Sequence, residues 1–490
     1  MGRSEKNVIS CDGYDRRDFG YYSTPDYIAN FMTDIMLNIK PEGKFVLDPA
    51  VGKEELLNKF HKIGKKIDSF DVYDYGNYNL SNFQQIDFIN YYCDLKSNII
   101  LNQKIDLKYD YYIVNPPYNC HEIDYIRENK KRLNGLFDDV GTHNMYSMFL
   151  SALIDCAHDD ALIGIITLDS FLTAKMHEGL RNKIVNQCSI HYLILCPTDL
   201  FWDQKADVRT CIMILQKGKK NQGTVYVSNR PTDRNNLKNI LENKDFLEMS
   251  VDDIILKNEI DFNEFIIGCP KKIKSLFEYP RIGEIFNCVT GISTGNDAKY
   301  ISKEKKGNYS IPFYKNPGTR RFYTTPDGYL PDNFLEIDKQ VKNFMVRNKK
   351  LLFQEGITCS SMGVSFGACY LPPNSTYGVN ANIICKNSDI WWLLSYLNSS
   401  LVSYIVRSCL IRSNMITSGY VSRIPVPPFS NLIKDKLSQI SKDAFEKKVK
   451  RNETQEYINK IDKIIFDYLN LEEGITNEIN YFTHNLLKAV

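Results

Sequence analysis

The sequence predicts an α/β fold in which a doubly wound, Rossmann-like sheet precedes a C-terminal α+β domain and a helical tail. Short apolar runs alternate with amphipathic stretches over residues 44–216, and short β-like runs broken by Gly, Pro, Asn and Ser fill residues 276–430. Helical spacing of apolar residues returns after residue 431. Because 490 residues are too many for one ordinary domain, two or three cores are expected.

Six apolar runs, rich in Val, Ile, Leu or Tyr, predict buried strands. They cover residues 44–47, 67–72, 111–114, 161–168, 190–196 and 208–215. Helical spacing predicts intervening helices at residues 54–64, 145–157 and 177–185. This alternation implies right-handed crossovers and a mostly parallel sheet that binds ligands at the carboxyl ends of its strands.

A further helix is predicted before the first strand, with Thr24 as its N-cap and Pro25 as its first residue. Its apolar face consists of Ile28, Phe31, Met32, Ile35 and Met36. The chain becomes polar and rich in turn residues after about residue 217. We therefore expect a first domain at 1–240, a connector at 241–275, a second domain at 276–430 and a helical segment at 431–490.

The net charge of +2 conceals a division of charge along the chain. Residues 1–200 hold 21 basic and 28 acidic side chains, whereas residues 201–450 hold 36 and 24. The excess is greatest at residues 299–350, with 12 basic and 5 acidic side chains. This division predicts a polyanion-binding module joined to a domain that need not bind polyanions. The alternative is a solvated surface rich in lysine.

Composition argues against a membrane protein, a secreted protein and a disulfide framework. No run of about 18 uncharged apolar residues occurs, and residues 1–22 are too charged for a signal-peptide core. The 13 cysteines are scattered and include no CxxC pair, so we expect thiols in a reducing cytoplasm and no metal site.

The most specific chemical signal is Asn115-Pro116-Pro117-Tyr118, directly after the apolar run 111–114. Two prolines at a strand's end force a stiff, extended loop. This loop would present the Asn115 side-chain oxygen and the Pro116 carbonyl as acceptors beside an aromatic ring. Two acceptors and a stacking surface suit a planar group with a neutral amino substituent, as in adenine or cytosine. Accepting both N–H hydrogens would aim the nitrogen lone pair at an electrophile without a strong base. The alternative is a plain turn.

A second signal is the sequence FVLDPAVG at residues 45–52, a strand that ends in Asp48 and a tight turn. Two acids, Glu54 and Glu55, follow Gly52 in what we expect to be the first turn of a helix. Acids there complement the helix dipole and repel anions. The turn therefore fits a ligand without phosphates, such as a sulfonium cofactor that carries a cationic amino-acid group.

Acids that follow the second strand are candidates to bind the cofactor's ribose and base. Asp71, with Asp74 as the alternative, could accept both ribose hydroxyls. Asp87 could accept an adenine amino group, and Phe88 could cover the ring. Isolated acids are usually solvated, so simple exposure is the alternative for each.

Taken together, these motifs resemble, in content and order, the gamma-class amino-methyltransferases of DNA, the adenine-N6 enzymes of restriction-modification systems of the TaqI type. Residues 22–25 (YSTP) are similar to that family's N-terminal cofactor motif, and residues 48–52 (DPAVG) to its DPAxG motif. NPPY is its catalytic tetrad, and residues 144–150 are similar to its NLYxxF helix start. Residues 200–205 resemble a loop that supplies an aromatic to the flipped base, where Phe201 matches better than Trp202. Glu54 departs from the family, which often has a second glycine there.

The resemblance implies a methyltransferase sheet that binds S-adenosylmethionine and a C-terminal target recognition domain for duplex DNA. The implied catalytic residues are Asn115, Pro116, Pro117, Tyr118 and Phe201. The implied cofactor contacts are Tyr22, Thr24, Asp48, Pro49, Ala50, Gly52, Asp71, Asp74, Asp87, Phe88 and Asn115. The candidate DNA contacts are Arg320, Arg321, Arg347, Lys349 and Lys350. Extruding the base costs a few kcal/mol, roughly offset by stacking of about 1–3 kcal/mol per base on Tyr118 and Phe201.

We therefore expect a sequence-specific DNA adenine-N6 methyltransferase, a cytoplasmic monomer that works in a restriction-modification or related defence system, with any restriction endonuclease encoded separately. Cytosine-N4, RNA or protein-glutamine methylation could use a similar tetrad. Asn at its first position favours adenine in this family, and a recognition-like domain of about 150 residues favours DNA. The alternative from another class is a non-catalytic DNA-binding specificity or scaffold protein. We expect no nuclease domain before Thr24.

Overall fold

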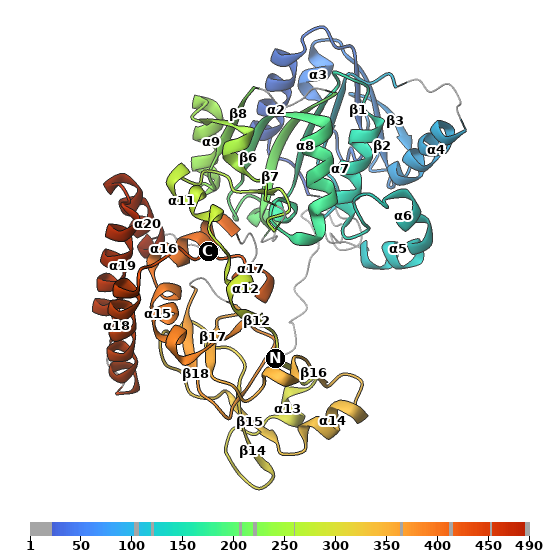
Figure 1. Ribbon diagram of the computed structural model, residues 1–490. Helices are drawn as coiled ribbons and strands as arrows, with labels where there is room; N and C mark the ends of the chain where they lie inside the picture. The colour runs from blue at the N-terminus through green and yellow to red at the C-terminus, as the bar shows by residue number, and fades with distance from the viewer. Residues whose placement is uncertain are drawn as a thin grey trace. The chain divides into compact units, whose positions relative to one another are not determined.

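The computed structural model divides into two compact units, Met1–Gly268 and Cys269–Val490 (Figure 1). It describes residues 22–101, 107–118, 122–204, 208–218, 223–258, 260–362, 366–410, 415–450 and 453–485. The boundary between the units lies inside the segment 241–275, which we expected to be a connector.

The first unit is built on a nine-stranded sheet of order β3-β2-β1-β4-β5-β7-β6-β8-β9. Its strands are β1 (Phe45–Asp48), β2 (Lys66–Asp71), β3 (Asn82–Gln85), β4 (Tyr111–Val114), β5 (Leu162–Leu168), β6 (Cys188–Leu195), β7 (Thr210–Lys217), β8 (Thr224–Ser228) and β9 (Leu247–Ser250). Strands β3, β2, β1, β4 and β5 are parallel, whereas β7 is antiparallel to β5 and β6. The six predicted strands are confirmed as β1, β2, β4, β5, β6 and β7. Because β1, β2 and β4 are parallel, their carboxyl ends meet at the same sheet edge, where Asp48 and Asp71 end β1 and β2 and Asn115 follows β4.

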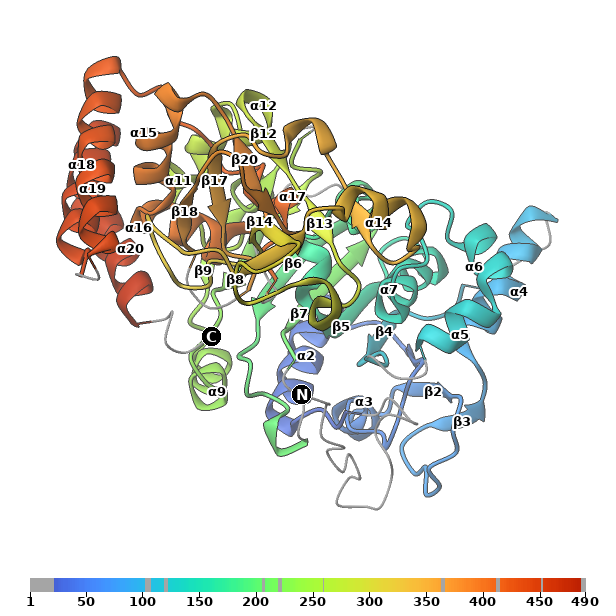
Figure 2. The same cartoon turned by 90° about the horizontal axis from the view of Figure 1, so that it is seen from below.

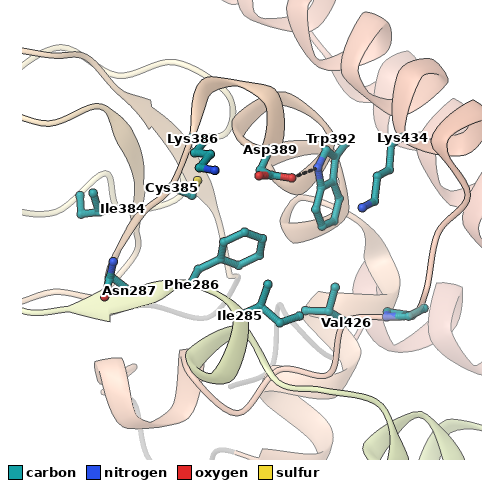
Figure 3. A pocket seen from close by; sticks show the side chains of 11 residues that line it. Ile285, Phe286, Asn287, Ile384, Cys385, Lys386, Asp389, Trp392, Val426 and Lys434 are labelled. Atoms are coloured by element: carbon teal, nitrogen blue, oxygen red, sulfur yellow. Dashed lines mark hydrogen bonds between the residues drawn. The ribbon is translucent and has the colours of Figure 1, made fainter.

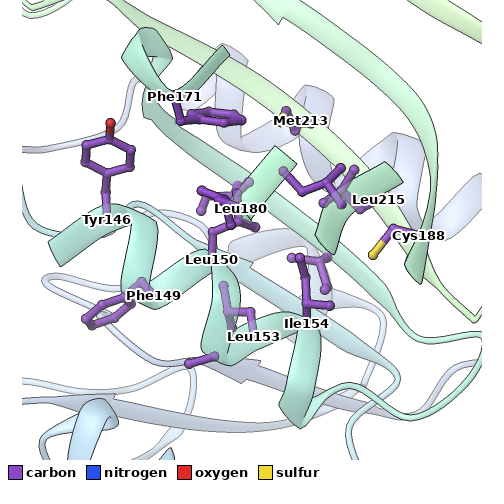
Figure 4. Close-up of a cluster of buried hydrophobic side chains, with 14 of the residues drawn as sticks. Tyr146, Phe149, Leu150, Leu153, Ile154, Phe171, Leu180, Cys188, Met213 and Leu215 are labelled. Atoms are coloured by element: carbon purple, nitrogen blue, oxygen red, sulfur yellow. The ribbon is translucent and has the colours of Figure 1, made fainter. Parts of the chain in front are cut away.

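Helices cover both faces of this sheet, which confirms the doubly wound fold. One face carries α4 (Phe88–Ile100), α7 (Met145–Cys156) and α8 (Glu178–Gln187), and the other carries α2 (Asp26–Ile39), α3 (Asn58–Lys62) and α9 (Arg234–Asn243). Figure 4 shows the first of these cores, where Leu150, Leu153 and Ile154 of α7 pack with Met213 and Leu215 of β7. Two separate apolar cores hold the carboxyl edge of the sheet in a fixed geometry.

The remaining elements of the first unit are short and lie around the sheet. They are α5 (Glu122–Glu128), α6 (Lys130–Leu136), α10 (Val251–Ile254), β10 (Ile255–Leu256), β11 (Glu264–Phe265) and three 3₁₀ turns, η1 (Asp169–Leu172), η2 (Lys175–His177) and η3 (Trp202–Gln204). Val251, Ile254, Ile255 and Phe265 are buried in the core that contains α7. This unit therefore continues past residue 240.

The predicted start of the first helix is wrong by one residue. Pro25 is the N-cap of α2, with Asp26 as its first helical residue, and no side chain caps this end. The Thr24 hydroxyl accepts a hydrogen bond from the Asn115 side chain instead. A residue that looked like a helix cap therefore contacts the first residue of the NPPY tetrad.

The predicted helix at 54–64 is also wrong at its beginning, because α3 starts only at Asn58. Residues 52–57 form turns, and Glu54 has the left-handed backbone angle φ 64°. A left-handed residue cannot continue a right-handed helix. Glu54 and Glu55 therefore lie in a turn before the helix and not in its first turn.

The second unit is an α+β domain, as predicted, and it contains small sheets and a helical C-terminal region. Its sheets have the orders β12-β20-β17-β18, β15-β14-β19 and β13-β16. Their strands are β12 (Asn287–Val289), β13 (Ile292–Ser293), β14 (Tyr309–Tyr314), β15 (Gly328–Pro331), β16 (Met345–Val346), β17 (Gly356–Cys359), β18 (Ala368–Leu371), β19 (Thr376–Tyr377) and β20 (Asn382–Ile384).

The helical tail consists of α18 (Asn431–Val449), α19 (Gln455–Leu469) and α20 (Glu473–Asn485), rather than one helix. Figures 1 and 2 show α18 and α19 side by side, with α15 (Asn387–Leu397) against α18. The shorter elements of this unit are α11 (Lys271–Ser275), η4 (Leu276–Glu278), α12 (Ile282–Ile285), α13 (Asp297–Tyr300), α14 (Phe334–Gln340), η5 (Lys349–Leu351), α16 (Ser400–Tyr404), the π-helix η6 (Ile405–Leu410) and α17 (Ser418–Val421). The Asp462 carboxylate of α19 accepts the backbone N–H of Ser400 at 2.7 Å. The tail is thus packed into the second unit.

Two findings bear on the expected class of protein. Among the described residues, no helix is long and apolar enough to cross a membrane. Eight of the cysteines that the structure describes are buried. Cys11 and Cys120 lie outside the described residues, as does the charged N-terminal segment 1–21.

We predict that Lys183→Ala destabilises the first unit by about 2–4 kcal/mol, because this buried ammonium pairs with two carboxylates. Its Nζ lies 2.9 Å from Asp139 Oδ2 and 2.7 Å from Asp155 Oδ2. The exposed pair of Lys257 with Asp252 is the control, for which Lys257→Ala should cost less than about 1 kcal/mol. Urea unfolding would measure both, and equal losses would contradict the prediction.

Candidate active site

The Asn115 side chain is held by the segment that precedes α2. Its Nδ2 donates to the Tyr22 carbonyl at 2.8 Å and to the Thr24 hydroxyl at 2.9 Å. Since both contacts are made to oxygens, the amide nitrogen must face them and the amide oxygen must face the opposite way. Three residues that we predicted to line one site are therefore in contact.

The oxygen of that amide is a buried acceptor. Asn115 Oδ1 has no hydrogen-bond donor among the described residues. Leaving such an acceptor unpaired costs about 1–3 kcal/mol, so native structures keep few of them. An N–H group of a ligand would satisfy this oxygen.

Three aromatic rings lie beside Asn115. Tyr118 is fully buried, and its hydroxyl donates to the Ile166 carbonyl of β5 at 2.7 Å. The Tyr118 ring centroid lies 6.3 Å from that of Phe201 and 5.4 Å from that of Tyr22. Phe201 is fully buried, whereas Trp202 is 67% exposed. The structure thus brings Phe201, rather than Trp202, to the tetrad.

The loop that carries Phe201 is attached to the segment before α2. Gln204 accepts the Ser23 backbone N–H at 2.9 Å and donates to the Ser23 carbonyl at 2.7 Å. These two bonds join residues 181 positions apart. Lys205, in the same predicted motif, lies outside the described residues. No periodicity in the sequence signals this contact, since it pairs a side-chain amide with backbone groups.

The carboxyl ends of β1 and β2 carry an acidic group of side chains. Asp48 is buried and accepts the Ala50 backbone N–H at 3.1 Å. Burial raises its pKa well above the ordinary value, that hydrogen bond partly opposes the rise, and the charges of Asp71 and Glu54 add to it. Pro49 and Ala50 form the turn after Asp48.

Asp71 organises the turn that begins at Gly52. Its Oδ2 accepts the Gly52 N–H at 3.0 Å and its Oδ1 accepts the Tyr73 N–H at 3.1 Å. Burial raises the pKa of Asp71, and these backbone hydrogen bonds oppose the rise. Because the Gly52 amide is bound to a carboxylate, it does not face an incoming phosphate. This agrees with the expectation of a ligand without phosphates.

Glu54 has a role that its sequence position did not reveal. Its carboxylate accepts the backbone N–H groups of Asn79 at 2.9 Å and Leu80 at 3.1 Å, and the Ser81 hydroxyl at 2.7 Å. These contacts hold the loop after β2 against the Gly52 turn. The positive φ of Glu54 favours glycine, which matches the glycine that similar enzymes often have here.

The other predicted cofactor residues lie in different surroundings. Asp74 is exposed and accepts the Gly76 N–H at 2.8 Å. Asp87 accepts the Ile89 N–H and the Tyr125 hydroxyl, each at 2.8 Å. Phe88 is buried in the core beside Phe149, with 5.1 Å between ring centroids. Asp71 is thus integrated into the turn, whereas Asp74 caps an exposed bend.

The candidate DNA contacts in the second unit differ in environment. Arg347, Lys349 and Lys350 are exposed, and Lys349 Nζ lies 2.6 Å from Asp338 Oδ2. Arg320 is exposed and donates to the Thr324 hydroxyl at 2.6 Å. Burial lowers the pKa of Arg321, which the charge of Asp462 partly opposes. Arg321 is half-buried and is therefore a weaker candidate than the other four, which are exposed.

The second unit also contains a pocket of about 480 Å³, but it holds none of these basic candidates. Figure 3 shows Trp392 above it, with its indole N–H donating to Asp389 at 3.0 Å and Lys434 Nζ 4.7 Å from the ring centroid. The pocket is lined by Ile285, Phe286, Asn287, Ile384, Cys385, Lys386, Asp389, Trp392, Val426, Pro427 and Lys434. Within the described residues, no group of three or more His, Cys, Asp or Glu side chains could hold a metal ion.

Comparison with known proteins agrees with this geometry. Residues 14–261 match the N-6 DNA methylase family over half of the chain. The chain belongs to that family. Family membership makes S-adenosylmethionine the methyl donor that the first unit has to hold.

Solved structures of restriction-modification enzymes are similar in fold at low sequence identity. A DrdV–DNA complex is 12% identical, with a TM-score of 0.53 over 88% of this chain and 57% of that one. A nuclease-deletion mutant of the Type ISP enzyme LlaGI is 13% identical, with a TM-score of 0.52 over 89% and 55%. The Type ISP enzyme LlaBIII is 11% identical, with a TM-score of 0.51 over 86% and 39%. This methylase chain therefore spans little more than half the length of the first two.

The acidic residues of this methylase fit S-adenosylmethionine chemically. Its sulfonium and ammonium groups are cationic, and its ribose offers two hydroxyl donors. Buried carboxylates with raised pKa values gain from both kinds of group, since each stabilises the ionised form. The cofactor would be held by Asp48, Asp71 and Glu55. When bound, it would supply the methyl group that is transferred.

We predict that the affinity of the methylase for S-adenosylmethionine falls by up to about tenfold from pH 8 to pH 6. Burial raises the pKa of Glu55 to about 7, backbone hydrogen bonds oppose this, and Asp71 adds to it. A cationic ligand favours the ionised carboxylate, so binding below pH 7 must first release a proton. Calorimetry at several pH values would measure this dependence. It should weaken in Glu55→Gln, where Asp48 and Asp71 remain, and persist in full in the exposed control Glu242→Gln; an unchanged dependence in Glu55→Gln would contradict the assignment.

Proposed function

We propose that this chain transfers the methyl group of S-adenosylmethionine to the N6 amino group of an adenine extruded from duplex DNA, at a specific sequence. The single observation that carries this proposal is Asn115 Oδ1, a buried acceptor without a donor whose direction is determined by Tyr22 and Thr24. An exocyclic amine is the neutral donor that fits it. We further propose that the chain is the modification component of a restriction-modification system.

The proposed chemistry depends on orienting a weak nucleophile. The adenine amine is a poor nucleophile because its lone pair is delocalised into the ring. Asn115 Oδ1 and the Pro116 carbonyl would each accept one amine hydrogen, which favours a more tetrahedral nitrogen. The two carbonyl dipoles would then stabilise positive charge as it develops on that nitrogen. Tyr118 and Phe201 would hold the base by stacking.

The order of the strands supports transfer between neighbouring sites. Asp48 and Asp71 are the last residues of β1 and β2, and Asn115 directly follows β4, which pairs with β1 in parallel. The acidic residues and the amide acceptor therefore lie at adjacent strand ends. We propose that the donor binds above β1 and β2, beside the base at the end of β4.

We propose that residues 276–430 recognise the DNA target and that the first domain, 1–240, is catalytic. The exposed candidates Arg320, Arg347, Lys349 and Lys350 support the first assignment. The LlaGI and LlaBIII structures, similar in fold, were solved with a DNA substrate mimic and with DNA.

We also propose that the chain is a monomer in the cytoplasm and acts beside a separately encoded endonuclease. The scattered cysteines, which include no CxxC pair, support a reducing compartment.

The decisive test incubates the protein with S-adenosylmethionine labelled in its methyl group and unmethylated mixed-sequence duplex DNA at low salt. We predict label in N6-methyladenine after digestion to nucleosides. Asn115→Ala should lower the rate by about 100-fold or more, because it removes a preorganised acceptor, and should change cofactor affinity only a few-fold. Phe201→Ala should also lower the rate, with the exposed neighbour Trp202→Ala as the matched control. Label in N4-methylcytosine alone, or full activity of Asn115→Ala, would overturn the proposal.

A second prediction concerns the basic surface of the second unit. The double variant Lys349→Ala, Lys350→Ala should weaken DNA binding and flatten its salt dependence by about 0.9 in slope per lost phosphate contact. Lys257→Ala, on an exposed surface of the first unit, is the control and should leave the slope unchanged. Binding titrations at several salt concentrations measure the slope. An unaltered slope in the double variant would mean that these lysines only cover a solvated face.

A further inference from the structure

We infer that the ring of Tyr22 occupies the place of the extruded base in the free enzyme and must leave when the base enters. This inference rests on the proposed function, since it concerns the same stacking site. The resemblance in sequence assigned residues 22–25 to cofactor binding. The geometry points to an additional role for the Tyr22 side chain, as a gate residue for the base.

The rings against which a base would stack are already covered. Tyr118 and Phe201 are both fully buried. Tyr22 is stacked on Tyr118 at 5.4 Å with an interplanar angle of 29°, and its centroid lies 5.8 Å from Phe201. A base stacked on the same face of Tyr118 would need the volume that Tyr22 fills. Of the three rings, Tyr22 is the half-buried one, so it borders the solvent from which a base arrives.

The backbone around Tyr22 is held independently of its ring. The Tyr22 carbonyl accepts from Asn115 Nδ2, and both backbone groups of Ser23 are bound to Gln204. The proposed exchange therefore requires rotation of the Tyr22 side chain only, while these hydrogen bonds hold the backbone in place. Asn115 keeps its orientation during the exchange, so its free oxygen still faces the incoming amine.

This exchange makes base entry selective. A tyrosine ring satisfies the stacking surface of Tyr118 but leaves Asn115 Oδ1 without a donor. Adenine replaces the stacking and also supplies the missing N–H. Thymine carries an oxygen where this amine would be, so it would displace the ring without gaining that hydrogen bond. Tyr22 thus opposes the entry of every base, because its ring must first be displaced. Only a base with an amino group offsets this cost, because it donates the N–H hydrogen bond that Asn115 Oδ1 otherwise lacks.

The test uses 2-aminopurine, a fluorescent adenine analogue whose amine is on C2 and so cannot reach Asn115 as adenine does. Methylation-sensitive sequencing of DNA from expressing cells first identifies the modified adenine, and a duplex with 2-aminopurine at that position is the probe. We expect the full-length Tyr22→Ala variant to extrude the analogue with an equilibrium constant about fivefold or more above that of the wild type. Tyr22→Phe, which keeps the ring, should resemble the wild type. Equal fluorescence of all three proteins at saturating DNA would overturn the inference.

A second measurement does not depend on Tyr22→Ala remaining folded. Site-specific replacement of Tyr22 by 4-fluorophenylalanine keeps a ring at this position and adds one fluorine resonance. We expect this resonance to shift when the target duplex is added. An unchanged resonance in a sample whose DNA is methylated would overturn the gate while leaving the proposed function intact. Failure of the wild-type enzyme to methylate adenine would instead overturn the proposed function.

Discussion

The hydrogen bonds that Asn115 Nδ2 donates to Tyr22 and Thr24 are the constraint on which the rest of the site depends. They connect the end of β4 to the segment before α2, and they require α2 to be docked on its face of the sheet. That docking depends on the buried apolar side of α2, including Ile28, Met32 and Met36. Core packing far from the chemistry thus determines the direction of one amide oxygen.

In the turn after β1, where we propose that the methyl donor binds, backbone strain at Glu54 is offset by the hydrogen bonds of its carboxylate. Glu54 adopts a left-handed conformation, which costs a non-glycine residue about 1–2 kcal/mol. Its carboxylate also accepts hydrogen bonds from Asn79, Leu80 and Ser81, and such bonds to a charged group are stronger than neutral ones. A glycine would avoid the strain but could not hold the loop after β2. Compared with the glycine of similar enzymes, Glu54 therefore makes the turn more strained but attaches the loop after β2 more firmly.

Sequence reasoning succeeded where burial leaves a pattern and failed where a contact depends on the fold. Strands such as β4 and β5 are buried on both faces, so their continuous apolar runs were readable. The edge strand β3 (Asn82–Gln85) is mostly exposed and polar, so no apolar pattern predicted it. NPPY was recognisable because its chemistry is local. The bonds between Ser23 and Gln204, and the stacking of Tyr22 on Tyr118, join distant positions that only the assembled sheet brings together.

The carboxyl edge of the sheet, where Asp48, Asp71 and Asn115 lie, contains features that reduce the stability of the free protein. Within the part of the chain that the structure describes, the buried acceptor Asn115 Oδ1 has no donor, and burial disfavours the charged forms of Asp48 and Asp71. All of them lie at one end of a sheet whose two cores are otherwise densely apolar. Native proteins retain unpaired or buried polar groups of this kind at functional sites, where a bound ligand supplies the missing partner. A cationic cofactor would relieve the carboxylates and an amino-bearing base would satisfy the amide, so each ligand would stabilise the fold by binding. The placement of these costs, rather than their size, supports our proposal that this edge binds two different ligands.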